Sequence, residues 1–554
     1  MDAPHRGPAA RASRDAPATP SQSGARPSRF GRPFWRRHAI FSVLLVVAFG
    51  LRLVALLGYR WALWFNDSYE YVGAALHLEP HNVRPSGYSL MLKALQPLHS
   101  FAFVTIVQHL MGLACGVLVY ALLRHRYRLP GWAASLAAVP ALFDAYQIAL
   151  EHLVLSDTLF GFLVVAAVTV ALWKTGPVSW KRGMTVGLLL AGAALTRSVG
   201  LPLLIVFVGY LLLRRAPWKT LGATIVACAV PMLLYMGWFA GVHGQFAMTT
   251  SSGSFLYVRV MSFADCDKIK PPVDELPLCT STPTGDRPVP QYYIWGKVSP
   301  LHRVWPKNFT PDQSEIAGDF AKRAIIAQPL DYLHDVGLST LRTFYWTHSP
   351  YPDPDTYGMY QFGSKEHPLP TWQVMGNGTA ADQMVQYAGG GRASTNIVEP
   401  FAGFLRWYQH WIFLRGTPLG VLLLAGLAGI VARWRRPADR PEAVPGVRGW
   451  VVARWRGVQA RSGTLLLPFG VAVALLVAPP ATTDFDYRYV LPAVPLACVA
   501  AAIAAARSRT VRRGAAAIRR RLRRRRPAET PTGTGEPRVR MPAPQPTESG
   551  AAKA

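Results

Sequence analysis

The chain has 554 residues, of which 51% are hydrophobic and only 16% are charged, and its formal net charge is +29. The apolar residues form blocks of roughly 20 instead of following a helical or strand period, which indicates several membrane spans and excludes a soluble globular protein. Much of the positive charge lies in two tails and in short arginine-rich connections, where it sets topology and contacts anionic lipid of the bilayer, so we exclude nucleic acid as a partner.

Two basic tails flank the apolar part of the chain. Residues 1–38 and 507–554 are rich in Arg and Pro and cannot bury a core, so we expect both to be disordered. The first apolar block, Ala39–Gly58, runs straight into Tyr59-Arg60-Trp61, an interfacial anchor pattern rather than a signal-peptide cleavage site. We therefore interpret this block as a retained membrane helix.

Ten apolar blocks are candidate spans, and they predict an all-α polytopic membrane protein with a mixed extracytoplasmic loop region. An N-terminal transmembrane module covers residues 39–240, and C-terminal helices cover 416–506. Two of the blocks are short and could together form one broken hairpin that dips in from the outer face. The ten are Ala39–Gly58, Phe101–Leu123, Gly131–Leu150, Ser156–Trp173, the short Gly183–Arg197 and Leu201–Leu213, Thr220–Ala240, Thr417–Val431, Gly463–Ala481 and Val490–Ala505.

Basic and acidic connections alternate along the chain. One set of connections is basic. The other set, residues 59–100 and 241–415, carries the acidic and aromatic residues. By the positive-inside rule, both termini are then cytoplasmic and these two segments face outward from the cell membrane. The basic connections are Arg124–Arg128, Lys174–Arg182, Arg214–Lys219 and Arg433–Arg461.

The outward segment 241–415 is interrupted by many prolines, and we interpret it as a lid over the membrane part. Within it, Tyr332–Trp346 is typical of an interfacial amphipathic helix with aromatic anchors. Cys266 and Cys279 are the two cysteines of the segment, so we predict a short loop-closing disulfide between them, with two unpaired thiols as the alternative.

Ionisable residues gather at the predicted outer ends of the spans. Such residues cost free energy to keep near a membrane, so they call for a functional explanation. Asp67 and Glu70 are three residues apart and would share one face of a helix. The cytoplasmic side shows only simple basic connections, so we expect the active face to be outside. The residues are Asp67, Glu70, Arg84, Glu151, Asp157, Arg197, Asp486 and Arg488.

The order and common sidedness of five motifs resemble the GT-C glycosyltransferases, and more narrowly their bacterial branch related to protein O-mannosyltransferases and aminoarabinose transferases. The resemblance covers about residues 39–240 and the last two spans. Its motifs are Asn66–Tyr71, Arg84–Leu90, Leu155–Phe160, Leu195–Arg197 and Tyr487–Ala493. It implies an inverting enzyme that moves a hexosyl or pentosyl group from a polyprenyl-phosphate donor to an extracytoplasmic acceptor.

This chemistry needs a base for the acceptor hydroxyl and cations for the phosphate leaving group. Asp67 would be the base. Arg84, Arg197 and Arg488 would bind the donor phosphate, because a guanidinium can engage two phosphate oxygens at once. The residue before Asp67 is Asn66 and not a second acidic residue, so a divalent metal requirement stays open. The carboxylates that would orient the sugar or the acceptor are Glu70, Glu151, Asp157 and Asp486.

Each of these residues also has a structural interpretation. Asp67 and Asp157 could cap the helices that follow them, and Arg84 and Arg488 could be interfacial side chains that extend toward water. Arg197 is harder to explain in this way, because it ends a span on the outer side against the positive-inside trend.

The sequence also leaves other functions open. A transporter or flippase of lipid-linked sugars is one alternative, although no internal repeat is visible. A non-catalytic envelope assembly protein is another. For a transferase, the acceptor could be an envelope glycan, a glycolipid or a protein hydroxyl.

Overall fold

The computed structural model describes residues 34–434, except 298, 307 and 377, and residues 447–506. Most of both predicted tails and the middle of one basic connection therefore lie outside the described residues. The described chain is mainly helical, and its two named strands, β1 (Tyr59–Arg60) and β2 (Asn396–Ile397), are two residues long and pair antiparallel. The predicted all-α fold class is confirmed.

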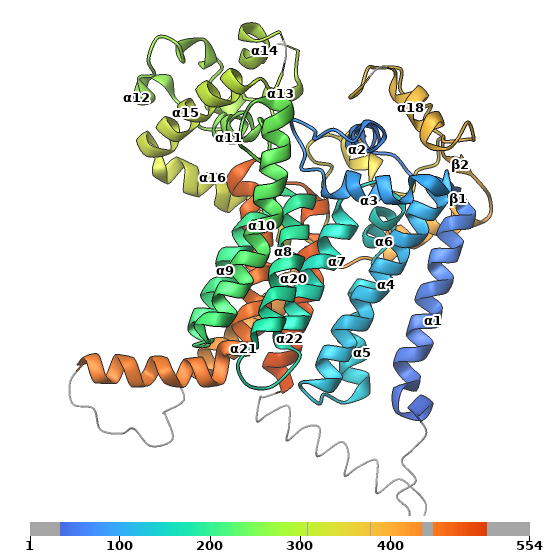
Figure 1. Cartoon of the computed structure of the whole chain (residues 1–554), viewed down its shortest axis with the longest axis vertical. Helices are drawn as coiled ribbons and strands as arrows, with labels where there is room; N and C mark the ends of the chain where they lie inside the picture. The colour runs from blue at the N-terminus through green and yellow to red at the C-terminus, as the bar shows by residue number, and fades with distance from the viewer. Residues whose placement is uncertain (1–33, 298, 307, 377, 435–446, 507–554) are drawn as a thin grey trace, which may run out of the picture.

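Apolar helices form a bundle that runs vertically in Figure 1, apart from the first part of α21 (Val447–Thr482), which lies horizontally at the lower end. Each predicted span coincides with one of them, except that the third is divided between two helices. They are α1 (Phe34–Gly58), α4 (Phe101–His125), α5 (Gly131–Phe143), α6 (Ala145–His152), α7 (Asp157–Leu172), α8 (Trp180–Thr196), α9 (Leu201–Leu213), α10 (Trp218–His243), α20 (Gly416–Trp434), α21 (Val447–Thr482) and α22 (Val494–Ala506).

Fewer helices than the ten predicted meet the length and composition of a membrane span. Among the described residues five do so, and up to seven spans result if each of two bent pairs counts as one. The pairs are α5 with α6, at 49°, and α19 (Phe401–Trp411) with α20, at 53°. The protein is thus a multi-pass membrane protein, and the count of ten stays a prediction.

The break between α5 and α6 has a local cause. Pro140 lies in the last turn of α5, and Asp144 caps α6 by accepting hydrogen bonds from two backbone amides of its first turn, at 2.9 and 3.2 Å. Arg52 of α1 donates to the carbonyl of Leu142, at 2.6 Å, so a carbonyl near the break remains satisfied inside the bundle.

Residues 244–415, which we call the cap, cover one end of the bundle (Figure 1). One part lies over α9 and α10, and the other packs on the first loop, which contains α2 (Asn66–His77) and α3 (Gly87–Leu95). Besides α19, the cap helices are α11 (Ser252–Val260), α12 (Cys266–Ile269), α13 (Tyr292–Trp295), α14 (Pro300–Val304), α15 (Pro311–Ala327), α16 (Pro329–Leu341), α17 (Pro354–Met359) and α18 (Ala380–Tyr387).

The predicted amphipathic helix corresponds to α16 and the short turn that follows it. Leu330, Leu333 and Leu341 of α16 are 78%, 63% and 54% exposed, and Trp346 beyond it is 57% exposed. Such an apolar face at the junction of cap and bundle fits the interfacial position that the sequence indicated.

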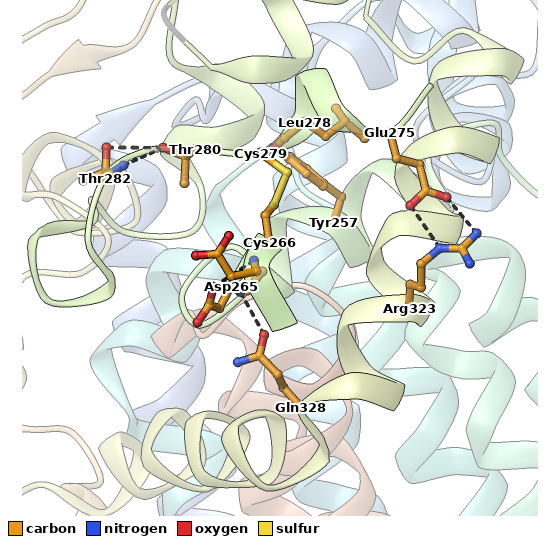
Figure 2. The surroundings of a disulfide bond; sticks show 12 residues. Tyr257, Asp265, Cys266, Glu275, Leu278, Cys279, Thr280, Thr282, Arg323 and Gln328 are labelled. Carbon is orange, nitrogen blue, oxygen red and sulfur yellow. Dashed lines mark hydrogen bonds and ion pairs between the residues drawn. A yellow bond between two sulfur atoms is a disulfide. The ribbon is translucent and has the colours of Figure 1, made fainter. Parts of the chain in front are cut away.

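A disulfide joins Cys266 and Cys279 in the cap, with their Cα atoms 6.1 Å apart (Figure 2). The bridged loop is tied to α15 by Glu275, whose two carboxylate oxygens accept hydrogen bonds from Arg323 at 3.1 and 3.2 Å. Tyr257 of α11 donates to the carbonyl of Leu278 at 2.8 Å. The loop therefore belongs to the small hydrophobic core between α11 and α15.

The described chain begins and ends at the same end of the bundle, opposite the cap (Figure 1). The basic connection between α4 and α5 and the one between α9 and α10 also lie there. The compartment that each end faces stays a prediction.

Candidate active site

Asp67 is the second residue of α2, at the cap end of the bundle. The chain reaches it from α1 through a short extended segment, in which Leu63 forms a parallel bridge with Leu153. Ser68 Oγ accepts a hydrogen bond from the backbone amide of Phe65 at 2.9 Å, which closes the first turn of α2. The N-cap residue of α2 is Phe65, and the Asp67 carboxylate accepts from two arginines, so the capping interpretation does not account for Asp67.

Two arginines converge on the carboxylate of Asp67, one from the same loop and one from the start of the last span. Arg84 Nη2 donates to Oδ1 at 2.6 Å, and Arg488 Nη1 donates to Oδ2 at 3.4 Å. Burial disfavours the ionised form, but the positive charges of Arg84, Arg488 and Arg197 outweigh it and hold the pKa of Asp67 well below its usual range. Asp67 is therefore a carboxylate at neutral pH.

Arg488 is fixed by a second carboxylate. Asp486 accepts hydrogen bonds from the backbone amide of Arg488 at 3.1 Å and from its Nε at 2.8 Å. Asp486 is 1% exposed, and this burial raises the pKa of its carboxyl although Arg488 opposes the shift. The Arg488 guanidinium carbon lies 4.3 Å from the centre of the Phe65 ring, so it also packs on the segment that precedes Asp67.

Arg197 and Asp157 extend the cluster. They form an ion pair, and the guanidinium carbon of Arg197 lies 4.7 Å from the centre of the Tyr489 ring, against which Arg488 also packs at 5.0 Å. Arg197 occupies the break after α8, and Asp157 is the first residue of α7. Segments from the first loop, α7, α8 and the start of the last span thus meet at one point.

Glu70 faces away from this cluster toward the cap. Its Oε2 lies 3.1 Å from His81 Nε2 and accepts a hydrogen bond from the backbone amide of Met375 at 3.3 Å. Burial raises the pKa of Glu70, but the contacts with His81 and Met375 and the charge of Arg84 lower it overall. Glu70 therefore links α2 to the cap.

The structure does not bring Glu151 to the cluster. Its side chain is fully buried among the helices, and both oxygens are occupied by Arg52, His109 and Gln147. Of the eight predicted residues, six form the cluster or its immediate support: Asp67, Arg84, Asp157, Arg197, Asp486 and Arg488. Glu70 lies on its rim, and the expected role of Glu151 in sugar or acceptor orientation has no geometric support.

Sequence reasoning missed two residues, one in the cluster and one inside the bundle. Tyr489 lies between Arg197 and Arg488, within a motif from which we selected only the charged residue Arg488 for the site. Arg52 is a charged residue inside the first apolar span, and this position was a signal in itself, because an unpaired arginine there would be costly. Among the described residues no group of three or more His, Cys, Asp or Glu side chains is placed to hold a metal ion.

No protein-family model matches the sequence, and no curated protein matches it. Solved structures do match. The S. cerevisiae protein O-mannosyltransferase Pmt1–Pmt2 complex bound to the sugar donor is 17% identical, with 42% of this chain and 37% of that chain covered and a TM-score of 0.31. ArnT from Cupriavidus metallidurans bound to undecaprenyl phosphate is 16% identical, with coverages of 89% and 82% and a TM-score of 0.33.

The archaeal oligosaccharyltransferase AglB from Archaeoglobus fulgidus, in complex with an inhibitory peptide and a dolichol-phosphate, is 13% identical, with coverages of 90% and 53% and a TM-score of 0.35. This chain thus spans well under half the length of the yeast chain and about half the length of the archaeal one. Because the TM-scores are this low, we base the function on the side chains of the site.

Proposed function

We propose that the protein is an integral membrane glycosyltransferase that moves a sugar from a polyprenyl-phosphate donor to an acceptor hydroxyl on the extracytoplasmic side. The observation that supports this most is an ionised carboxylate, Asp67, held between Arg84 and Arg488 at one end of a membrane bundle. A base and phosphate-binding cations are the two groups that this reaction requires.

The reaction balances with these groups. The acceptor oxygen attacks the anomeric carbon, the bond from that carbon to the phosphate oxygen breaks, and the hydroxyl proton passes to Asp67. The products are the glycosylated acceptor and a polyprenyl phosphate. A single displacement of this kind inverts the anomeric centre.

The arginines of the cluster are suited to stabilise the negative charge that the leaving phosphate gains. Arg84, Arg197 and Arg488 are formally balanced by Asp67, Asp157 and Asp486. The donor is a phosphodiester with one negative charge, and the leaving phosphate gains a second. Guanidinium groups placed where that charge develops stabilise the transition state more than the ground state.

A transport function has less support. Ionisable residues of transporters tend to lie near the midplane of the bilayer, where the substrate is bound. Here the arginine cluster lies at the cap end of the bundle, and the deeper charged residues Arg52 and Glu151 are occupied by each other. A transferase uses the position of the cluster directly, because its acceptor arrives from outside the membrane.

The decisive experiment measures the transfer of radiolabelled sugar from a polyprenyl-phosphate donor by the purified full-length protein in lipid nanodiscs. Profiling of lipid-linked metabolites in a deletion strain would identify the donor, because the unused polyprenyl-phosphate sugar should accumulate. Asp67→Asn is the inactive comparison, and Asp319→Asn is the matched control, because Asp319 is exposed in the cap, where it pairs with Lys322. Transfer that is equal in Asp67→Asn and wild type would contradict the proposed base.

The orientation of the site needs its own test. We expect a cysteine introduced at Ser281, in the cap, to react with a membrane-impermeant maleimide added to intact cells. A cysteine at Ser462, in α21, should react only after the membrane is opened. If both cysteines were labelled from outside the cell, the predicted topology would be wrong. The result would contradict an extracytoplasmic location of the arginine cluster.

A further inference from the structure

A continuous chain of buried polar side chains lies in the bundle below the first loop. Arg52 donates from Nε and Nη2 to the two oxygens of Glu151, at 2.9 and 3.0 Å. His109 Nδ1 lies 3.0 Å from Glu151 Oε2, and its Nε2 lies 3.0 Å from His152 Nδ1. The chain ends where His152 Nε2 lies 2.6 Å from the carbonyl oxygen of Tyr59. All four residues are at most 3% exposed.

This series of hydrogen-bonded groups begins at the Glu151 carboxylate and ends at the Tyr59 carbonyl, which are both acceptors. The two acceptors determine how many protons the groups between them need. A carboxylate oxygen and a backbone carbonyl can only accept, so the three hydrogen bonds between them require three protons. Two neutral imidazoles carry one N–H each and supply two. The chain therefore needs a third proton for all three contacts to be hydrogen bonds, and His152 must donate from Nε2 to Tyr59, because a carbonyl oxygen can only accept.

His152 holds both ends of the segment that leads to Asp67. Its ring contacts the carbonyl of Tyr59, and its own backbone carbonyl accepts a hydrogen bond from the amide of Leu63 at 3.0 Å. Leu63 in turn accepts from the amide of Val154 at 3.2 Å. Asp67 follows four residues after Leu63, so a shift of this segment would displace the carboxylate from its two arginines.

A neighbouring residue makes a second connection from α4 to the first loop. Gln108 donates to the carbonyls of Glu151 and Leu153, at 3.1 and 2.6 Å, and accepts from the hydroxyl of Tyr88 at 2.8 Å. The Tyr88 ring meets the Tyr71 ring of α2 edge-on, with the ring centres 5.0 Å apart. The same turn of α4 is therefore connected both to the segment before α2 and, through Tyr88, to the middle of α2.

The site for Glu151 is built tightly. Gly112 of α4 lies against its carboxylate, and a Cβ at this position would be 1.8 Å from Oε1. The charged group is thus accommodated by the absence of a side chain opposite it, and every polar contact that it needs comes from the protein.

We propose that Glu151, His109 and His152 form a proton-holding network that positions the Tyr59–Leu63 segment and, through it, Asp67. Its catalytic consequence rests on the proposed function, in which Asp67 is the base. The three are positioning residues, because none of them contacts the arginine cluster.

Hydrogen–deuterium exchange of the full chain in lipid nanodiscs tests the positioning without any ligand. His152→Phe keeps a ring of similar size but removes both nitrogens, so the peptide that covers residues 59–67 should exchange at least about tenfold faster. The matched control is His125→Gln, at the opposite end of α4, where His125 stacks on Trp173. It should leave this peptide unchanged. Exchange in α22 reports whether the bundle as a whole remains folded.

A second variant covers the case in which His152→Phe does not fold. A glutamine at position 109 can donate to Glu151 or to His152 but not to both. His109→Gln therefore interrupts the hydrogen-bonded network while keeping a polar group. It should produce the same local effect in the 59–67 peptide. Native-like exchange in that peptide in a folded variant would overturn the proposal. The ¹⁵N spectrum of labelled histidine adds a direct test, because an unprotonated Nε2 in His152 would also overturn it.

Kinetics separates this inference from the proposed function. In a folded variant, kcat should fall by about tenfold or more, while KM for the donor changes little, because the phosphate-binding arginines lie on other segments. If the wild-type protein transferred no sugar at all, the proposed function would fail. The exchange measurement would still decide whether the network positions the loop.

Discussion

Asp67→Asn removes one negative charge from the centre of the arginine cluster and almost preserves the size of the side chain. The asparagine oxygen can still accept from Arg84, which donates at 2.6 Å to the native Oδ1. The amide nitrogen would then face Arg488 Nη1, 3.4 Å from the native Oδ2, and two donors would oppose each other. Arg488 stays in place because Asp486 still accepts from its Nε.

The expected kinetic effects differ for chemistry and for binding. Loss of a positioned general base should lower kcat by about 10²–10⁴-fold, equivalent to about 3–5 kcal/mol in the barrier. The formal charge of the cluster rises from zero to +1, so the anionic donor should bind as tightly as before or more tightly. We therefore expect a large fall in kcat with an unchanged or lower Kd for the donor.

The effect on stability should be smaller than the effect on catalysis. Removing one partner of a fully buried ion pair costs about 3–5 kcal/mol. Asp67 is 21% exposed at its side chain and Arg488 retains a second carboxylate, so the loss should stay below that range. Initial rates, donor titration and thermal melting in nanodiscs measure the three quantities, with Asp319→Asn as control. A kcat near the native value would refute Asp67 as the base.

Three further predictions concern the arginines, the acidic end of the last span and the cap. Arg197→Lys should weaken donor binding by about tenfold with a smaller change in kcat, because a lysine keeps the charge but cannot grip two phosphate oxygens; donor titration measures this. Burial raises the pKa of Asp484, just before the last span, to about 6, so its ionisation lowers the free energy of unfolding as pH rises from about 4 to 6. This decrease should amount to about 2–3 kcal/mol and should be absent in Asp484→Asn. Thermal melts of both proteins at the two pH values measure it. Mass spectrometry of unreduced, alkylated protein should show the disulfide-linked Cys266–Cys279 peptide, and alkylation of both thiols without reduction would contradict the bridge. Replacing both cysteines by alanine should lower the stability of the cap by about 2–4 kcal/mol, which faster proteolysis of the cap would show.

The sequence could predict the arginine cluster because its members stand at the ends of apolar blocks. Asp67 and Asp486 each lie next to a span boundary that hydropathy makes visible, and the alternation of charge along the connections assigns those boundaries to one face. The all-α class followed from the same blocks. Which arginine pairs with which carboxylate was not accessible, because Arg488 and Asp67 are more than four hundred residues apart in the chain.

The fate of Glu151 shows where such reasoning stops. Glu151 and Asp157 are six residues apart and were assigned to the same face, yet one packs inside the bundle and the other reaches the cluster. The chain leaves α6 at His152 and starts α7 at Asp157, and this turn separates their environments. The partner of Glu151 is Arg52, on a helix that begins more than a hundred residues earlier, so only tertiary structure could identify it.

The arrangement around Asp67 also implies an order of events in the proposed reaction. While Arg84 and Arg488 hold its carboxylate, Asp67 is ionised but weakly basic, because the same charges that lower its pKa stabilise the anion. A donor phosphate that draws these guanidinium groups toward itself would weaken both contacts and make Asp67 a stronger base. The acceptor hydroxyl would then lose its proton only when the donor is in place. Replacing either arginine by a neutral side chain should therefore impair donor binding, and it should also raise the pKa of Asp67, which makes the acidic limb of the pH–rate profile move upward in pH.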